Sequence, residues 1–148
     1  MIETTAKYRT LNDHIVYTKE HKNADYREHP SKTVCVTTCL NFLGIDFDSY
    51  KYTSSPKHAH YWRQVVRRAG FSLRRWKTAF GKEAYPTMTK VRKRLRQSEF
   101  GANDFFLVSG IQKNCGHLMV LDGKGQIVID TAPGKKWHIR QVYKVTKK

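Results

Sequence analysis

The chain has 148 residues, 28 of them Lys or Arg against 12 Asp or Glu, so its formal net charge is +16. This length favours one domain, residues 1–148, and without an apolar run of ~20 residues or a signal-peptide core we expect neither a membrane-spanning nor a secreted protein. Three cysteines, an odd number, indicate free thiols in a reducing compartment, so we expect a cytoplasmic protein. We also expect no cofactor, no metal and no membrane contact.

Positive charge is unevenly distributed along the chain. Residues 1–30 form a polar N-terminal segment of mixed charge that we expect to consist mainly of loops. Residues 57–97 contain 13 basic side chains and one acidic side chain, Glu83. Such a segment attracts nucleic acid, acidic proteins or anionic surfaces over long distances, but it does not determine a fold.

The segment SKTVCVTTCLNFLGIDF predicts the first helix. Ser31 or Thr33 can cap its N-terminus, and Gly44 is typical of the residue just beyond a helix C-terminus. At about 100° per residue, Cys39 falls inside the apolar stripe, where a free cysteine is usually a small buried hydrophobe. Cys35 falls in the first turn, where the helix dipole and free N–H groups favour a partly exposed thiolate.

The basic segment, residues 57–97, is predicted to be a helical insertion with one strand. Ser55-Pro56 starts a helix that ends at Gly70, FSLRRW (71–76) forms the strand, and another helix follows near 87–97. The buried faces of the two helices are predicted to consist of Trp62, Val65, Val66, Ala69, Met88, Val91 and Leu95. The exposed residues predicted to bind nucleic acid or an acidic partner are Arg63, Arg67, Arg68, Arg74, Arg75, Lys90, Arg92, Lys93, Arg94 and Arg96.

The C-terminal part of the chain predicts an antiparallel sheet. NDFFLVSG (103–110) is typical of a strand, GHLMVLDGKGQIVIDT (116–131) of a β-hairpin, and a last strand passes through Ile139, Val142 and Val145. Because the helices come first and the sheet follows, the predicted fold class is α+β.

The hairpin brings a histidine and an acid together. With Gly123 and Lys124 at the centre of a type II′ turn, Leu121 faces Gln126 and His117 faces Asp130. Directly opposite residues have Cβ atoms roughly 4.5–5.5 Å apart, so the imidazole and the carboxylate can meet. Such a pair is either a polar cross-strand contact or part of a nucleophilic site, and a slip of one residue would separate it.

A thiol at a helix N-terminus, a histidine on a later strand and an acid on the next strand follow the chain order of the papain-like cysteine peptidases. The sequence resembles small phage-encoded members of that fold in TVCVTTCL (33–40), GHLMV (116–120) and IDT (129–131). The resemblance implies a papain-like α+β fold, in which the nucleophile helix packs on a C-terminal antiparallel sheet. For a phage-encoded protein it also implies a location in the host cytoplasm.

Carried over by position, the resemblance implies that Cys35 is the nucleophile, His117 the general base and later acid, and Asp130 the residue that orients the imidazole. An adjacent imidazolium and the helix N-terminus stabilise a thiolate, which attacks a carbonyl carbon. His117 then protonates the leaving amine, and water releases the acyl group. The implied activity is hydrolysis of an amide or isopeptide bond in a protein or peptide.

The chain departs from the papain-like pattern at the oxyanion site. These enzymes usually carry a Gln a few residues before the nucleophile, whereas the first Gln here is Gln64. The backbone N–H of Cys35 supplies one oxyanion donor, and His29 is the candidate for the second. The departure leaves open a catalytically inactive papain-like fold that binds nucleic acid or a host protein.

Two further interpretations remain open. Cys35, Cys39, Cys115 and His117 are four potential zinc ligands, although their spacing is not that of a common zinc motif. Alternatively, the basic segment binds nucleic acid without catalysis, with cations on phosphates and rings stacked on bases. The aromatic residues interleaved with its charges are Tyr61, Trp62, Phe71, Trp76, Phe80 and Tyr85. No specific nucleic-acid recognition motif accompanies them, so this signal is electrostatic.

Overall fold

The computed structural model describes residues 34–45, 61–112, 115–130 and 136–148. The elements in this part of the chain are α3 (Val34–Phe42), α4 (Tyr61–Arg68), β1 (Phe71–Arg75), the 3₁₀ turn η3 (Lys77–Ala79), α5 (Met88–Arg96), β2 (Phe105–Gln112), β3 (Cys115–Asp122), β4 (Ile127–Ile129) and β5 (His138–Lys147). The pairings between these strands are antiparallel. The α+β class predicted from the sequence is therefore confirmed.

The strands form one five-stranded sheet in the order β1-β5-β2-β3-β4. The central strand β2 pairs with β5 on one side and with β3 on the other. Its residues from Phe105 to Gly110 are all buried, which explains why this strand is a continuous apolar run instead of an alternating one. β1 and β4 form the two edges of the sheet.

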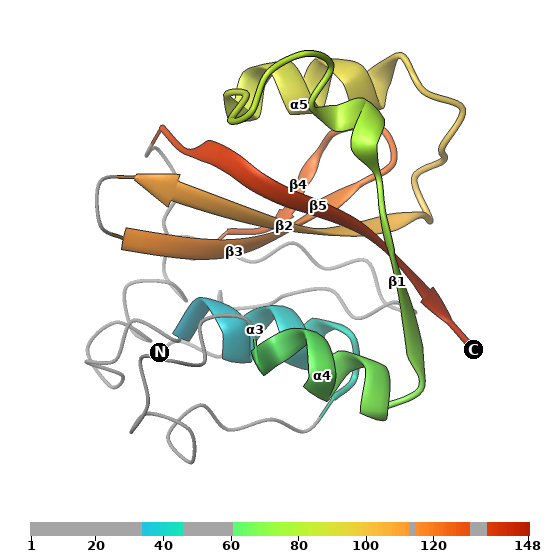
Figure 1. The fold of residues 1–148 in the computed structure, drawn as a ribbon. Helices are drawn as coiled ribbons and strands as arrows, with labels where there is room; N and C mark the ends of the chain where they lie inside the picture. Colours follow the sequence, from blue (N-terminus) through green and yellow to red (C-terminus); the bar gives the residue numbers. More distant parts are fainter. Residues whose placement is uncertain (1–33, 46–60, 113–114, 131–135) are drawn as a thin grey trace, which may run out of the picture.

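Helices cover both faces of the sheet (Figure 1). On one face lie α3 and α4, and Leu40 of α3 belongs to the same core as Leu107 of β2. On the other face lies α5, and its Leu95 belongs to a second core with Phe106 of β2. Alternate side chains of the central strand thus enter two separate cores, because successive residues of a strand point to opposite faces.

The C-terminus of α3 confirms the predicted role of Gly44. This residue adopts a left-handed φ of 84°, which costs a glycine little because it has no Cβ. Its N–H donates to the Asn41 carbonyl at 2.9 Å, and the Ile45 N–H donates to the Leu40 carbonyl at 3.0 Å. These two hydrogen bonds satisfy carbonyls that the end of a helix leaves without partners, and they end α3 after Phe42.

The described part of the basic segment, residues 61–97, belongs to the fold itself. α4 packs against β1, β1 pairs with β5, and α5 closes the second core. The predicted helix start at Ser55-Pro56 lies outside the described residues. The prediction that Ala69 is buried was wrong: Ala69 is exposed, because α4 ends at Arg68 and Gly70, with φ 97°, turns the chain into β1.

The predicted hairpin forms from β3 and β4, but the prediction of a type II′ turn was wrong. Gly123 does not adopt a positive φ, whereas Gly125 does, with φ 80°. The Gly125 N–H donates to the Asp122 carbonyl at 3.0 Å, and the buried Asp122 carboxylate accepts the Lys124 N–H at 2.9 Å. A tight turn followed by a left-handed glycine adds a residue to the loop, and this changes the register of the strands.

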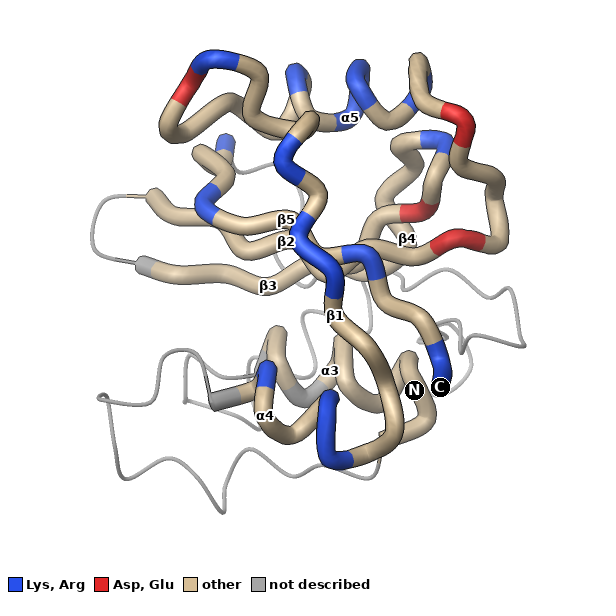
Figure 2. The backbone as a smooth tube through the Cα atoms, turned by 45° about the vertical axis from the view of Figure 1, so that its right-hand side comes forward, with Lys and Arg blue, Asp and Glu red and all other residues tan. Residues whose placement is uncertain are grey.

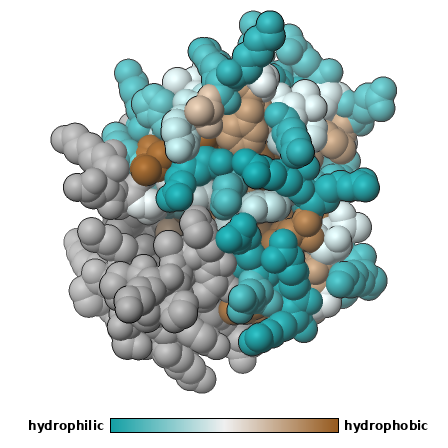
Figure 3. All heavy atoms as spheres, in the orientation of Figure 1, coloured by the Kyte–Doolittle hydropathy of each residue, from teal (hydrophilic) through white to brown (hydrophobic). Residues whose placement is uncertain are grey.

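The described surface is strongly hydrophilic. Teal side chains surround smaller brown patches on the face drawn in Figure 3. Basic residues lie along α4, β1, β5 and α5, with few acidic residues among them (Figure 2). Within the described ranges, no helix combines the length and the apolar character needed to cross a membrane.

Candidate active site

Cys35 lies in the first turn of α3, as predicted, one residue after the helix begins. Its backbone N–H is one of the first four of the helix, which have no acceptor within the helix. The prediction of a partly exposed thiol was wrong, because Cys35 is only 4% exposed. α3 packs against β3, and this contact brings Cys35 into the same core as Leu118, which the helical periodicity alone does not reveal.

His117 and Asp130 form the contact that the hairpin predicted. The distance between Nε2 of the imidazole and Oδ1 of the carboxylate is 2.7 Å. Both side chains are buried, with 3% and 7% of their surfaces exposed. Because little water reaches the pair, the hydrogen bond and the charge of the carboxylate act on the imidazole with little screening.

The register that produces this contact is not the predicted one. Leu121 lies opposite Ile127, and after a bulge Val120 lies opposite Ile129, so the prediction of a directly opposed His117–Asp130 pair was wrong. Continuing the observed register places Asp130 diagonally across from His117, on the same face of the hairpin. Diagonal neighbours are roughly 7–8 Å apart, within reach of an imidazole and a carboxylate.

Cys35 contacts the other side of the same imidazole. Its side chain hydrogen-bonds His117, and because Asp130 occupies Nε2, Nδ1 is the ring nitrogen left for the sulfur. Burial lowers the pKa of His117, but the hydrogen bonds and charges of Asp130 and Cys35 outweigh burial and raise it to about 9. The imidazole is therefore a cation at neutral pH, held between a carboxylate and a sulfur atom.

Trp137 covers the imidazole, a contact that no sequence pattern predicted. Its ring stacks on His117 with a centroid separation of 4.5 Å and an interplanar angle of 17°. A Cβ on Gly110, which pairs with His117 in the sheet, would lie 3.0 Å from the Cβ of Trp137. Gly110 thus leaves the space that Trp137 occupies. A tryptophan directly before a strand and a glycine within one are too common in sequences to have predicted this arrangement.

The start of α5 holds the chain on both sides of Trp137. The Met88 N–H donates to the Trp137 carbonyl at 3.2 Å, and the Ile139 N–H donates to the Pro86 carbonyl at 2.8 Å. Thr87, between them, caps α5 by accepting the Lys90 N–H on its side-chain oxygen. The basic segment therefore contributes directly to the geometry around His117.

Cys39 is a structural cysteine, as predicted. Its side chain is completely buried, and its Sγ donates to the Leu118 carbonyl at 3.5 Å. Burial, followed by the charges of Cys35 and Asp130, raises the pKa of the Cys39 thiol well above its usual value. Cys39 therefore stays protonated at neutral pH and is a poor nucleophile.

A groove of about 650 Å³ lies beside the strand end that carries the Gly110–His117 pair. It is lined by Tyr85, Ile111, Gln112, Lys136 and His138. Ile111 follows Gly110 directly on β2, and His138 follows Trp137 directly at the start of β5. The groove combines apolar surface with the side chains of Lys136 and His138, and it lies one residue along the chain from Gly110 and Trp137.

The predicted basic binding residues divide into two groups. Those that are exposed are Arg67, Arg68, Arg74, Arg75, Lys90, Lys93 and Arg96. The prediction of exposure was wrong for three half-buried arginines, which donate to Tyr143 Oη (Arg63, 2.9 Å), the Gly125 carbonyl (Arg92, 2.7 Å) and the Ala79 carbonyl (Arg94, 2.6 Å). A long guanidinium side chain can reach back from a helix surface to such acceptors, which helical periodicity does not predict.

Two expectations involve residues outside the described part of the chain. His29, the candidate oxyanion donor, lies there, and so does the side chain of Cys115, one of the four potential zinc ligands. Among the side chains that the structure describes, no group of three or more His, Cys, Asp or Glu is arranged to hold a metal ion.

Comparison with known proteins adds no identification. No protein-family model matches the chain, and neither a curated protein nor a solved structure matches it. The function of the chain must therefore be inferred from the chemistry of its own site.

Proposed function

We propose that the protein is a thiol hydrolase of papain-like type that cleaves an amide or isopeptide bond in a protein or peptide. One observation carries this proposal: the buried His117 imidazole is bound by the Cys35 side chain on one side and by Asp130 on the other. A nucleophile, a proton carrier and a group that orients the carrier are the parts that nucleophilic catalysis needs.

The protonation of His117 favours an ion-pair mechanism. With a pKa of about 9, the imidazole already holds its proton at neutral pH, so it is ready to act as an acid when the substrate binds. The imidazolium stabilises negative charge on the adjacent sulfur of Cys35, and the N-terminus of α3 adds to this effect.

The acylation step follows from this arrangement. The Cys35 thiolate forms a bond to the substrate carbonyl carbon, and the carbonyl electrons move onto the oxygen, where the Cys35 N–H can donate a hydrogen bond. When the carbon–nitrogen bond breaks, the proton on His117 passes to the leaving amine. Neutral His117 then takes a proton from water, whose oxygen attacks the thioester, and the thiolate and imidazolium are restored.

Asp130 and Trp137 position the imidazole in this mechanism. The 2.7 Å bond from Asp130 fixes the orientation of the ring and favours its charged form. The stacked Trp137 ring limits the ring's movement and covers one face of it. Because Cys35 is 4% exposed, a substrate must displace the groups that cover the sulfur before attack.

The papain-like assignment rests on chain order together with packing. The helix that carries the thiol packs on an antiparallel sheet whose neighbouring strands carry the histidine and lead into the acid. This arrangement supports a papain-like site, in which the basic segment supplies the edge strand β1 of the same sheet and the helices α4 and α5 that pack on its two faces (Figure 1).

Alkylation of the native protein tests the ion pair. We expect a small reagent such as iodoacetamide to label Cys35 selectively well below pH 8, the range in which an ordinary thiol is mostly protonated. Mass spectrometry after titration from about pH 5 to about pH 9 locates the label. Labelling should be lost in His117→Ala and retained in Cys39→Ala, the matched control for loss of a neighbouring thiol. Equal, slow labelling of all three cysteines would contradict the proposal.

Turnover is tested separately with fluorogenic peptide and isopeptide libraries. We expect cleavage by the native protein, loss of cleavage in Cys35→Ala, and an acyl-enzyme adduct on Cys35 when a peptidyl electrophile is supplied. Selective labelling of Cys35 without cleavage or adduct formation would show a reactive thiol without hydrolase activity, and it would overturn the proposed function.

A further inference from the structure

A second cavity lies between the end of β1, the following loop and β5, and it shares Tyr85 with the groove described above. Its volume is about 580 Å³, within the roughly 300–1,000 Å³ that is typical of small-ligand pockets. It is lined by Arg75, Lys77, Phe80, Gly81, Glu83, Ala84, Tyr85, Arg140 and Gln141. None of these residues belongs to the Cys35–His117–Asp130 group.

Three cations face this cavity. Arg75 and Lys77 are exposed and Arg140 is half-buried. The ion pairs found among the described residues involve none of the three. Their charges are therefore available to an anionic ligand, and guanidinium groups in particular suit phosphate oxygens, which they can bind with two parallel hydrogen bonds.

The one carboxylate in the lining does not cancel these charges. Glu83 forms an ion pair with Lys90 and lies 3.9 Å from Arg94 Nη2. The hydrogen bond from Lys90 lowers the pKa of Glu83, so its negative charge is already matched by cations of α5. The cavity remains electropositive.

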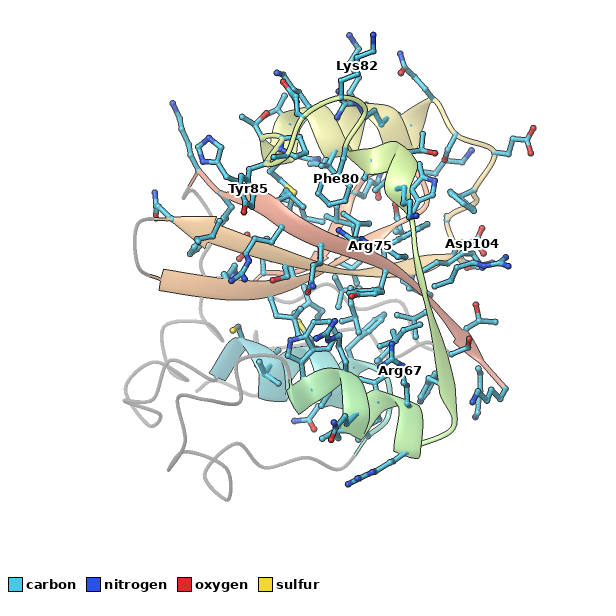
Figure 4. All side chains as sticks on the ribbon, in the orientation of Figure 1. Arg67, Arg75, Phe80, Lys82, Tyr85 and Asp104 are labelled. Atoms are coloured by element: carbon cyan, nitrogen blue, oxygen red, sulfur yellow. The ribbon has the colours of Figure 1, made fainter. Side chains whose placement is uncertain are left out.

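Two aromatic rings complete the apolar part of the lining. Tyr85 is 59% exposed, an unusual position for a ring of this size. Phe80 is half-buried, and the Arg75 guanidinium lies 5.8 Å from its centroid. Both rings come from the loop between β1 and α5, and Figure 4 shows them above the sheet, on the same side of it as α5. Exposed rings beside cations are suited to stack on bases.

Gln141 adds a polar group that lacks a partner. Its Oε1 is buried and makes no hydrogen bond with the described residues. A buried acceptor without a donor is unfavourable. If the Gln141 amide turns toward the cavity, a ligand that offers an N–H group, such as the exocyclic amine of a base, satisfies this acceptor.

We propose that this cavity binds a nucleoside phosphate, either as a free nucleotide or as one unit of a single-stranded nucleic acid. The phosphate contacts Arg75, Lys77 and Arg140, and the base stacks on Tyr85 and reaches Gln141. An acidic peptide would need the cations but would leave the exposed ring and the buried acceptor without a role. The cavity would give the nucleic-acid binding predicted for the basic segment one defined site.

Fluorescence anisotropy with labelled single-stranded oligonucleotides at several salt concentrations tests this proposal. We expect saturable binding that weakens as salt rises. Tyr85→Ala should weaken binding roughly ten-fold or more, the effect of losing one stacked base, whereas Tyr85→Phe should retain it. Competition by a mononucleotide identifies a free-nucleotide site, and binding of oligonucleotides alone identifies a single-strand site.

Arg67 provides the matched control for charge. It is exposed on α4, at the opposite side of the sheet from the pocket (Figure 4). We expect Arg75→Gln to weaken binding clearly more than Arg67→Gln, and Cys35→Ala to leave binding unchanged. Equal effects of the two arginine variants, no effect of Tyr85→Ala, or stronger competition by an acidic peptide than by a nucleotide would overturn the proposal. Because Tyr85, Arg75 and Arg67 are exposed, the variants at these three positions should fold. Circular dichroism verifies this for them and for the buried Cys35→Ala.

Discussion

The indole of Trp137 stacks on the imidazole of His117 at 4.5 Å and 17°. His117 lies on β3 and Trp137 directly precedes β5, and β2 lies between these two strands in the sheet. The two rings meet because Gly110 of β2 has no side chain at the point where Trp137 lies over the strand. An indole face attracts a cation, so the stack favours the protonated imidazole that the bonds to Cys35 and Asp130 also favour.

Gly110→Ala should disturb this stack. The new Cβ would lie 3.0 Å from the Trp137 Cβ and 3.3 Å from Met119 Cε, closer than packed carbon atoms normally approach. We expect a loss of about 1–3 kcal/mol in the free energy of unfolding, together with slower alkylation of Cys35. Gly116→Ala is the control, since a Cβ there meets no atom within 4 Å. Urea unfolding measures both variants, and equal stabilities would refute this account of Gly110.

The pKa of His117 predicts how stability depends on pH. The pKa is about 9 in the folded protein against 6.5 for an ordinary histidine. Because the folded state holds the proton more tightly, this stabilisation is fully present below about pH 6.5 and is lost as the pH rises through about 9. A difference of this size corresponds to about 3 kcal/mol.

Urea unfolding across this pH range, with NMR titration of the imidazole, measures the effect. In Asp130→Asn the pKa of His117 should fall toward 6.5, because the hydrogen bond to Asp130 is the largest contribution that raises it. The loss of stability should then occur at lower pH. An unchanged titration in Asp130→Asn would show that the carboxylate does not hold the proton on the ring.

Cys39→Ala should affect stability and leave the reactive thiol intact. Cys39 is fully buried and its Sγ contacts the Leu118 carbonyl at 3.5 Å. Removing the sulfur leaves a small cavity, which we expect to lower the free energy of unfolding by about 1–2 kcal/mol. The rate at which Cys35 is alkylated should stay the same when measured in folded protein. A large drop in that rate would show that Cys39 takes part in the chemistry.

Gly125→Ala should destabilise the hairpin that carries the acid. Gly125 has φ 80°, and a Cβ there would lie 2.5 Å from the Arg92 carbonyl oxygen. Backbone strain and the clash together should cost about 3 kcal/mol in the free energy of unfolding. Gly44→Ala separates the two effects, because Gly44 has φ 84° but open space around it, so only the strain of about 1–2 kcal/mol remains. Thermal unfolding of both variants should show the larger loss for Gly125→Ala.

The sequence by itself determined which segments form helices and strands and which residues carry reactive groups. Gly44 and Gly70 were recognisable as helix ends, because a left-handed residue at such a place is best supplied by glycine. His117 and Asp130 were recognisable as partners on one face of a hairpin, because the period of a strand is two residues; their contact is observed, in a register that differs from the predicted one.

Only the tertiary structure decided how the groups meet. The bulge beyond Leu121 changed the register, the packing of α3 on β3 buried Cys35, and the space above Gly110 admitted Trp137. These features depend on contacts between residues far apart in the chain. Local periodicity records only which side of an element is apolar, so it carries no information about what lies against that side.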